Sequence, residues 1–199
     1  MTDHYYTEKP QSDINEKHFT HEILGKKLYF TSVSGVFSFG EKIDKASEML
    51  IRNYKPSGAH PSILDVGCGI GPIALFIKSR YINLSVYAVD INERAVAYTQ
   101  KNAERNNLDI IAQKSDLYSA IIDKQFGDIV SNPPIAAGKA INTRLIEEAK
   151  EHLVPGGSLW LVAFHNKGGE TLKKIMNATF GNVEDIEKSG GIRVYRSEK

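Results

Sequence analysis

Two short segments of this sequence carry residues whose types and spacing suit chemistry: a glycine-rich run at 65–71 and an Asn-Pro-Pro segment at 132–134. The two prolines fix φ and remove two backbone N–H donors, so the second segment offers only acceptors, namely the side-chain oxygen of Asn132 and the carbonyl of Pro133. Two acceptors can hold both protons of a planar amino group and turn its nitrogen toward an electrophile. Catalysis would then consist of positioning, without a covalent intermediate. We therefore expect Asn132 and Pro133 to be the catalytic residues.

The glycine-rich run, Asp65-Val66-Gly67-Cys68-Gly69-Ile70-Gly71, follows an apolar strand and opens a helix. Glycines at these positions permit a tight turn with positive φ and let a ligand approach the backbone. Asp90 ends the next expected strand, where an acidic side chain can accept both hydroxyls of a ribose. Dinucleotide-binding folds share this context, so the glycines alone leave the ligand open, and a purely structural turn is the competing interpretation.

Three details favour S-adenosylmethionine (AdoMet) over NAD. The spacing is G-x-G-x-G instead of G-x-G-x-x-G, and Pro72 stands where the third dinucleotide glycine would be. Asp65 precedes the turn, where it could meet a cationic amino acid portion. AdoMet has an α-amino group and no pyrophosphate, so an acidic partner is reasonable. Together the two segments predict AdoMet-dependent methylation of a nitrogen, although an Asn-Pro-Pro segment by itself is more often an ordinary proline-rich loop.

Composition sets the class of protein. The chain has 199 residues, 41% hydrophobic and 25% charged, which is close to the globular average. A net charge of +1 makes no strong case for nucleic acid, but a local basic face can exist within a balanced total. The lone Cys68 fits a reducing, cytoplasmic compartment, and six histidines without paired spacing predict no metal site. No apolar run approaches the roughly 20 residues of a membrane helix, so we expect a soluble protein.

The elements that must position these segments alternate between strand and helix after residue 61, which predicts an α/β fold with a mostly parallel sheet and helices on both faces. A hairpin around Gly190-Gly191 would add an antiparallel edge. We expect one domain, 1–199, with an N-terminal extension at 1–40 that carries a β-hairpin and a catalytic core at 41–199. Expected strands are 17–24, 27–32, 62–66, 85–90, 109–113, 127–131, 157–164, 182–188 and 191–197; expected helices are 41–54, 71–80, 93–106, 139–152 and 168–179.

With both motifs placed, the sequence resembles the class I AdoMet-dependent methyltransferases. More narrowly, it is similar to the small methyltransferase domain of the guanine-N2 methyltransferases of small-subunit ribosomal RNA, in a single-domain form. The resemblance covers about residues 19–197 and implies a Rossmann-like, seven-stranded sheet. The segments that carry it are Thr31-Ser32-x-Ser34-Gly35-Val36-Phe37-Ser38, Leu64-Asp65-Val66-Gly67-Cys68-Gly69-x-Gly71-Pro72, Val89-Asp90-Ile91-Asn92-Glu93-Arg94-Ala95, Ser115-Asp116-Leu117 and Asn132-Pro133-Pro134.

The resemblance implies a role for each matching position. Asp90 would hold the ribose, Asp116 would meet the adenine amino group, and Asn132 with Pro133 would hold the target amine. The full set of expected cofactor-binding residues is Asp65, Gly67, Gly69, Gly71, Asp90, Ile91, Asp116, Leu117 and Asn132. The expected substrate-binding residues are Gly35, Val36, Phe37, Pro134 and Ile135.

Two departures bear on the substrate. Bacterial ribosomal enzymes of this family often carry a second, degenerate methyltransferase-like half, and this chain lacks it. Many amino-methyltransferases place an aromatic residue after the second proline, whereas this sequence has Ile135, which disfavours adenine N6 and leaves guanine N2 acceptable. We expect an RNA methyltransferase whose partner is ribosomal RNA or the small subunit; the oligomeric state stays open. The alternatives are methylation of a protein glutamine amide, whose family usually has Tyr after the prolines and an added helical domain, and a non-catalytic AdoMet- or RNA-binding module.

Overall fold

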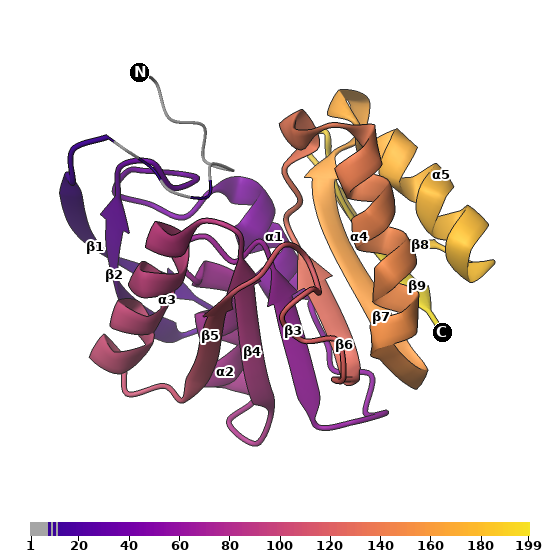
Figure 1. Ribbon diagram of the computed structural model, residues 1–199, viewed down its shortest axis with the longest axis horizontal. Helices are drawn as coiled ribbons and strands as arrows, with labels where there is room; N and C mark the ends of the chain where they lie inside the picture. Colours follow the sequence, from indigo (N-terminus) through magenta and orange to yellow (C-terminus); the bar gives the residue numbers. More distant parts are fainter. Residues whose placement is uncertain (1–7, 9, 11) are drawn as a thin grey trace.

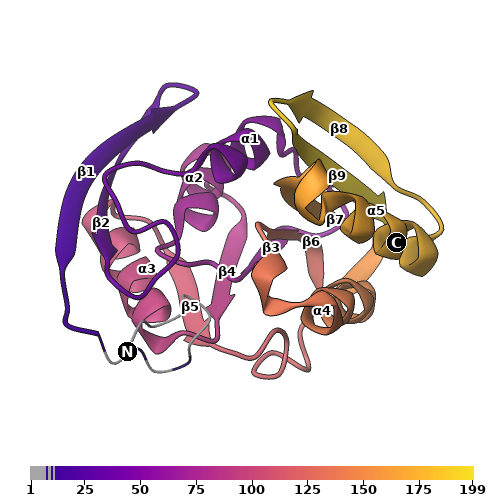
Figure 2. The same ribbon diagram turned by 90° about the horizontal axis from the view of Figure 1, so that it is seen from above.

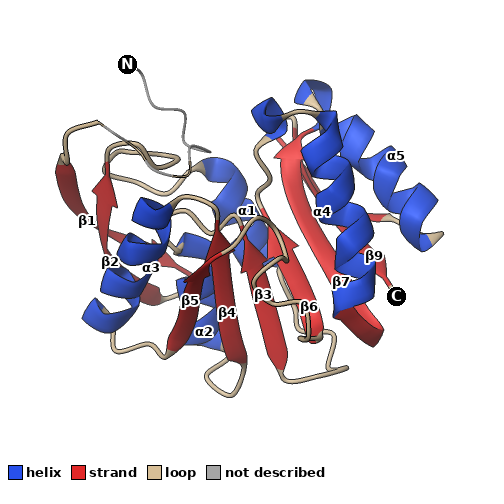
Figure 3. Cartoon of the chain, viewed as in Figure 1, coloured by secondary structure: helices blue, strands red, loops and turns tan. Residues whose placement is uncertain are grey.

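The computed structural model describes residues 8, 10 and 12–199, and its centre is a seven-stranded sheet covered by helices on both faces (Figures 1 and 3). The strand order is β5-β4-β3-β6-β7-β9-β8, in which the first five strands run parallel and β9 runs antiparallel to both of its neighbours. The strands are β3 (Ser62–Val66), β4 (Ser85–Asp90), β5 (Ile110–Lys114), β6 (Phe126–Ser131), β7 (Leu153–Phe164), β8 (Glu184–Ser189) and β9 (Ile192–Glu198). The predicted α/β fold is confirmed.

Five helices and two 3-10 turns connect these strands. They are α1 (Lys45–Asn53), α2 (Pro72–Arg80), α3 (Glu93–Arg105), η1 (Ile135–Ala137), α4 (Lys139–His152), η2 (His165–Lys167) and α5 (Gly169–Phe180). Helix α1 begins later than the predicted residue 41, because Asp44 has an extended backbone and caps the helix through the N–H groups of Ala46 and Ser47. Among the described residues, no helix is both long enough and apolar enough to span a membrane.

Two hydrophobic clusters pack against the sheet, one on each face. The first gathers buried residues of α1, α2 and α3, and the second gathers those of α4 and α5. Between β5 and β6 the chain forms no helix, and the buried side chains of Tyr118 and Ile121 cover that part of the second face. The hydroxyl of Tyr118 donates to the carbonyl of Leu145 at 2.9 Å, which ties this loop to α4.

The N-terminal hairpin is a separate two-stranded sheet, β1 (Glu16–Ile23) and β2 (Lys26–Val33), which turns at Leu24-Gly25. Figure 2 shows it outside α3, at the opposite end of the molecule from β8. Asn102 of α3 pairs with both backbone groups of Thr31, at 2.8 and 3.1 Å, and Asn106 does the same for Tyr29, at 2.9 and 2.7 Å.

This pairing works because the rise of four helical residues (~6 Å) nearly matches that of two strand residues (~6.6 Å). Helix α3 therefore satisfies the edge of β2 as a strand would. The predicted hairpin is thus present, while residues 1–7, 9 and 11 of the predicted extension lie outside the described residues. The division at residue 40 stays a prediction.

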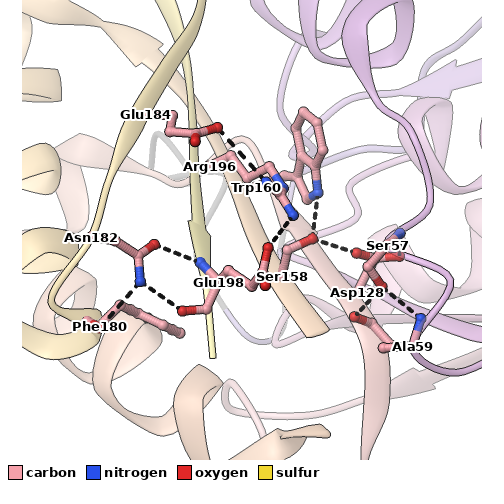
Figure 4. Close-up of polar contacts among 11 residues, drawn as sticks. Ser57, Ala59, Asp128, Ser158, Trp160, Phe180, Asn182, Glu184, Arg196 and Glu198 are labelled. Carbon is pink, nitrogen blue, oxygen red and sulfur yellow. Dashed lines mark hydrogen bonds and ion pairs between the residues drawn. The ribbon is translucent and has the colours of Figure 1, made fainter. Parts of the chain in front are cut away.

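A buried polar network centred on Asp128 lies at the end of the sheet opposite the glycine-rich run (Figure 4). Asp128 of β6 is 1% exposed and accepts from Tyr54, Ser57 and Ser158, at 3.0, 3.0 and 2.5 Å, and the indole of Trp160 donates to Ser158 at 2.9 Å. These contacts join α1, β6 and β7 on the side away from the glycine-rich run. They give the buried carboxylate a structural role.

The C-terminal strands form the predicted hairpin at Gly190-Gly191, where φ is +55° and +81°. Its cations are held in ion pairs within the chain. Lys188 and Arg193 both lie near Asp185, at 2.8 and 3.4 Å, and Arg196 pairs with glutamates of the same hairpin. Most of the basic charge of this hairpin is therefore neutralised locally.

Candidate functional site

A cavity of about 910 Å³, counting the part open to solvent, lies where β3, β4, β5 and β6 end. We call it the cofactor cavity. Strand order reverses at β3, which pairs with both β4 and β6, and α/β folds bind ligands beside such a reversal. Its lining is Val36, Phe37, Val66, Gly67, Gly69, Val89, Asp90, Ile91, Ser115, Asp116, Leu117, Asn132, Pro134, Ala137, Ile141 and Leu145.

Ten of the residues expected from the sequence line this cavity, drawn from segments far apart in the chain. They are Val36, Phe37, Gly67, Gly69, Asp90, Ile91, Asp116, Leu117, Asn132 and Pro134. The predicted site is thus assembled in one place. Which of them touch a bound cofactor or substrate stays a prediction.

The glycine loop is fixed to the end of β4. The N–H groups of Gly67 and Cys68 donate to the Val89 carbonyl at 2.8 and 3.0 Å, and the N–H of Gly69 donates to Asp90 Oδ2 at 2.9 Å. The other carboxylate oxygen of Asp90 accepts from the N–H of Asn92 at 2.9 Å. Burial raises the pKa of Asp90, and these N–H donors oppose the rise. The N–H of Ile91 is a third donor to this carboxylate, which has about four lone-pair sites, so at least one site remains to accept a ribose hydroxyl.

Gly67 and Gly71 serve different purposes within the same loop. Gly67 has φ +75°, and a Cβ placed there would meet nothing within 4 Å, so its bare backbone faces open space in the cavity. Gly71 has φ +87° but does not line the cavity, and a Cβ there would lie 2.6 Å from Leu75 and 3.0 Å from Thr99. This glycine therefore lets α2 pack closely against α3. A contact between Gly71 and the cofactor stays a prediction.

Asp65 lies in β3, just before the glycine loop. It is fully buried, its Oδ2 accepts from the N–H of Ala74 at 3.1 Å, and its Oδ1 has no partner among the described residues. Burial raises the pKa of Asp65 to about 7, the Ala74 N–H opposes the rise and the charge of Asp90 adds to it. Because successive strand residues point to opposite faces, Val66 lines the cavity and Asp65 points toward α2. Asp65 supports the first turn of that helix and does not line the cavity, and its contact with the cofactor stays a prediction.

Three other expected residues lie beside the cavity without lining it. Gly35 accepts from Asn92 Nδ2 at 2.8 Å, and a Cβ there would lie 3.0 Å from the guanidinium of Arg94, so it fixes the loop before α1. Pro133 is buried, and the role of its carbonyl as an acceptor for the target amine stays a prediction. Ile135 is half-buried, packs against the second hydrophobic cluster and lies close to Gly168, so it supports the loop. Its contact with a substrate stays a prediction.

Asn132 is held by two residues near the start of α1. Its Nδ2 donates to Ser47 Oγ at 3.0 Å and to Asp44 Oδ1 at 3.2 Å. Both amide protons are therefore directed to protein acceptors, and the side-chain oxygen remains as the acceptor for a ligand. Among the described residues, no hydrogen bond reaches the carbonyl of Pro133.

Sequence reasoning missed Asp44 and Ser47, along with several wall residues of the cavity: Val66, Val89, Ser115, Ala137, Ile141 and Leu145. An Asp just before a helix is a recognisable N-cap, which is the one signal that marked Asp44. Its contact with Asn132 joins residues 88 apart in the chain, and no local pattern contains that information.

The residues present fit AdoMet. Apolar walls at Ile91 and Leu117 can enclose an adenine, Asp90 can hold the ribose, and Gly67 leaves its backbone open beside them. Among the described residues, no group of three His, Cys, Asp or Glu side chains is arranged to hold a metal ion.

The chain matches known proteins over almost its whole length. The family model described as "Methyltransferase small domain" matches residues 27–196. The protein YbxB of Bacillus subtilis (strain 168), described as uncharacterized, is 36% identical over 201 residues and covers 100% of both chains. Ribosomal RNA small subunit methyltransferase C of Psychromonas ingrahamii is 34% identical over 178 residues, which are 86% of this chain and 49% of that protein.

A solved structure extends this likeness to three dimensions. The 16S rRNA N2 methyltransferase (RsmC) of T. thermophilus, in complex with AdoMet and guanosine, superimposes with a TM-score of 0.79 at 27% identity and covers 96% of this chain and 52% of that one. The chain thus spans about half the length of the ribosomal RNA methyltransferases that it matches. With the cavity and its glycine loop, these matches establish that the chain belongs to the methyltransferase small domain family and is an AdoMet-dependent methyltransferase.

Proposed function

We propose that this protein transfers the methyl group of AdoMet to the exocyclic N2 amine of a guanine in small-subunit ribosomal RNA. The observation that carries the proposal is the orientation of the Asn132 amide, whose Nδ2 is tied to Ser47 and Asp44. Among the described residues, no donor reaches the side-chain oxygen of Asn132 or the carbonyl of Pro133, which leaves them as two neighbouring acceptors.

An exocyclic amine on a base has two protons, and its lone pair is delocalised into the ring. If the oxygens of Asn132 and Pro133 each accept a hydrogen bond from one N–H of the amine, the nitrogen is held in one orientation, with its lone pair free for an in-line displacement. AdoMet supplies an electrophilic methyl group on a sulfonium sulfur. No side chain has to remove a proton beforehand, because the methylated amine loses its proton readily after transfer.

The choice of guanine N2 over other amines rests on the chain and its relatives together. The residue after the second proline is Ile135, so the Asn-Pro-Pro segment presents no aromatic ring on which an adenine could stack. The relatives include proteins named ribosomal RNA small subunit methyltransferase C and the RsmC structure with bound guanosine. Because the chain spans half of those proteins, the ribosomal substrate is our proposal for this chain.

The test uses tritium-labelled AdoMet and a small-subunit ribosomal RNA transcribed in vitro, which carries no prior modification. The transcript is offered free and as a reconstituted subunit, and the labelled nucleosides are then separated. We expect label in N2-methylguanosine, and the better acceptor identifies the natural substrate form. Label in another nucleoside, or none in either acceptor while AdoMet is bound, would refute the proposal.

Asn132→Ala tests the amine clamp within the same assay. The variant should lose methyl transfer by ~100-fold or more, because a misplaced reacting group costs about that much. Its affinity for S-adenosylhomocysteine (AdoHcy) should stay close to that of the wild-type protein, which shows that the cavity is intact. Turnover near the wild-type rate would show that Asn132 does not position the amine.

A further inference from the structure

A second, smaller hollow adjoins the cofactor cavity beside the glycine loop. It is lined by Phe37, Ser38, Lys42, Ile43, Asp44, Ser47, Gly67, Cys68, Gly69, Ile70, Pro72, Ile73 and Asn132. Four of these residues, Phe37, Gly67, Gly69 and Asn132, also line the cofactor cavity, so the two spaces are continuous. A ligand that fills the larger cavity can extend past Gly67 and Gly69 into the smaller one.

Asp44 contributes a carboxylate to this hollow, and only one of its two oxygens is used in hydrogen bonds among the described residues. Its Oδ1 accepts from the N–H groups of Ala46 and Ser47, each at 3.0 Å, and from Asn132 Nδ2 at 3.2 Å. Among the described residues, every hydrogen bond to this carboxylate goes to Oδ1. The half-buried side chain is thereby fixed in place while Oδ2 stays available. Lys42 lines the same hollow and adds a positive charge.

The cofactor supplies a matching group. Beyond its ribose and sulfur, AdoMet carries an amino acid portion with one ammonium and one carboxylate. The carboxylate expected from the sequence to meet this ammonium, Asp65, lies buried against Ala74 and lines neither space. We propose that the hollow binds the amino acid portion of AdoMet, with Asp44 Oδ2 accepting hydrogen bonds from the α-ammonium and Lys42 facing the α-carboxylate.

The arrangement links cofactor binding to the amine clamp. The same carboxylate caps α1, orients Asn132 and, on this proposal, receives the ammonium. A bound cofactor would therefore neutralise the charge beside Asn132 while leaving the Oδ1 contact in place. Asp44 is thus a cofactor-binding residue that also positions the residue proposed to hold the target.

The test compares two ligands that differ only in the amino acid portion. AdoHcy retains this portion, whereas methylthioadenosine has a methyl group in its place; neither is turned over. Asp44→Asn keeps an N-cap of equal quality and an Oδ1 acceptor, but replaces Oδ2 with an uncharged donor. Calorimetric titration should show AdoHcy binding weakened ~10-fold to ~100-fold, the effect of losing a hydrogen bond to a charged group, while methylthioadenosine affinity is unchanged.

Glu41→Gln is the matched control, because it removes the same charge from an exposed neighbour that lines neither space. It should leave both affinities unchanged. Equal weakening of both ligands by Asp44→Asn, or of neither, would overturn the proposal. So would an unchanged AdoHcy affinity accompanied by a raised KM for RNA, since the hollow would then hold the target base. The inference rests on AdoMet binding and the titrations need no RNA, so the outcome is independent of the proposed acceptor.

Discussion

The two glycines at the ends of the loop provide a sharp test of how the cavity is built. Both have positive φ, +75° at Gly67 and +87° at Gly71, so alanine at either position costs ~1–2 kcal/mol of backbone strain. At Gly71 the new Cβ also lies 2.6 Å from Leu75 and 3.0 Å from Thr99, and overpacking of this kind costs a further ~1–3 kcal/mol. At Gly67 the Cβ meets nothing within 4 Å.

Gly71→Ala should therefore lower the free energy of unfolding by ~2–5 kcal/mol, which corresponds to about 4–20 °C in Tm for a chain of this size. Gly67→Ala should lower it by only ~1–2 kcal/mol. AdoHcy binding should show the opposite order. The Gly67 variant places a methyl group in the cofactor cavity and should bind at least ~10-fold more weakly, as expected for an obstructed backbone contact. The Gly71 variant, once folded, should bind almost normally.

Urea unfolding followed by circular dichroism gives the stabilities, and calorimetric titration at a temperature where both variants are folded gives the affinities. A Gly71→Ala variant as stable as Gly67→Ala would refute the packing argument. A folded Gly71→Ala variant that binds AdoHcy as poorly as Gly67→Ala would restore the direct ligand contact that the sequence predicted.

The remaining predictions concern three carboxylates, of which Asp65 and Asp128 are buried and Asp90 is half-buried. Because burial raises the pKa of Asp65 to about 7, the folded protein keeps a proton that the unfolded chain releases near pH 4. The free energy of unfolding, measured by urea unfolding, should therefore fall as the pH rises from about 4 to about 7 and level off above that. The Asp65→Asn variant should lose most of this pH dependence. A variant with the wild-type slope would contradict that assignment. Asp90→Ala should weaken the binding of AdoHcy and of methylthioadenosine alike, by ~10-fold or more in calorimetric titration, because both ligands contain the ribose that Asp90 is proposed to hold. Unchanged affinities for both ligands would exclude that contact. Asp128→Ala leaves Tyr54, Ser57 and Ser158 without their acceptor and should cost ~3 kcal/mol or more in urea unfolding, with AdoHcy affinity unchanged; a loss below ~1 kcal/mol would show that the network adds little.

Most of the fold could be predicted because its signals are local. Alternating strand and helix patterns placed the sheet, and Gly190-Gly191 marked the last hairpin. Strand β7 was the least well bounded: it begins at Leu153 instead of 157, and its pairing with β6 shifts register between Phe126 and Asp128. A register shift depends on the neighbouring strand, so the sequence of β7 alone does not contain it.

The part of the candidate site that lies at the ends of parallel strands could be predicted from the sequence. Gly67, Asp90 and Asn132 each follow or end a parallel strand, so the fold brings them to one edge of the sheet. Gly71 and Ile135 belong to the same motifs, but neither lines the cavity, and each packs closely against another part of the fold, Gly71 near Thr99 and Ile135 near Gly168. A motif gives the position of a residue along the chain and leaves open what surrounds it.

The amino-acid sequence dictates a set of local conformations: a glycine turn after one buried strand, a carboxylate at the end of the next, and an acceptor-only loop after a third. Which side chains line the cavity depends on the tertiary structure. The pleat of β3 directs Asp65 to the N–H of Ala74, while Asp44, outside every quoted motif, meets Asn132 across 88 residues. The physical reason is that side-chain direction is local to a strand, whereas the partner that fixes and uses a side chain comes from wherever the fold brings it.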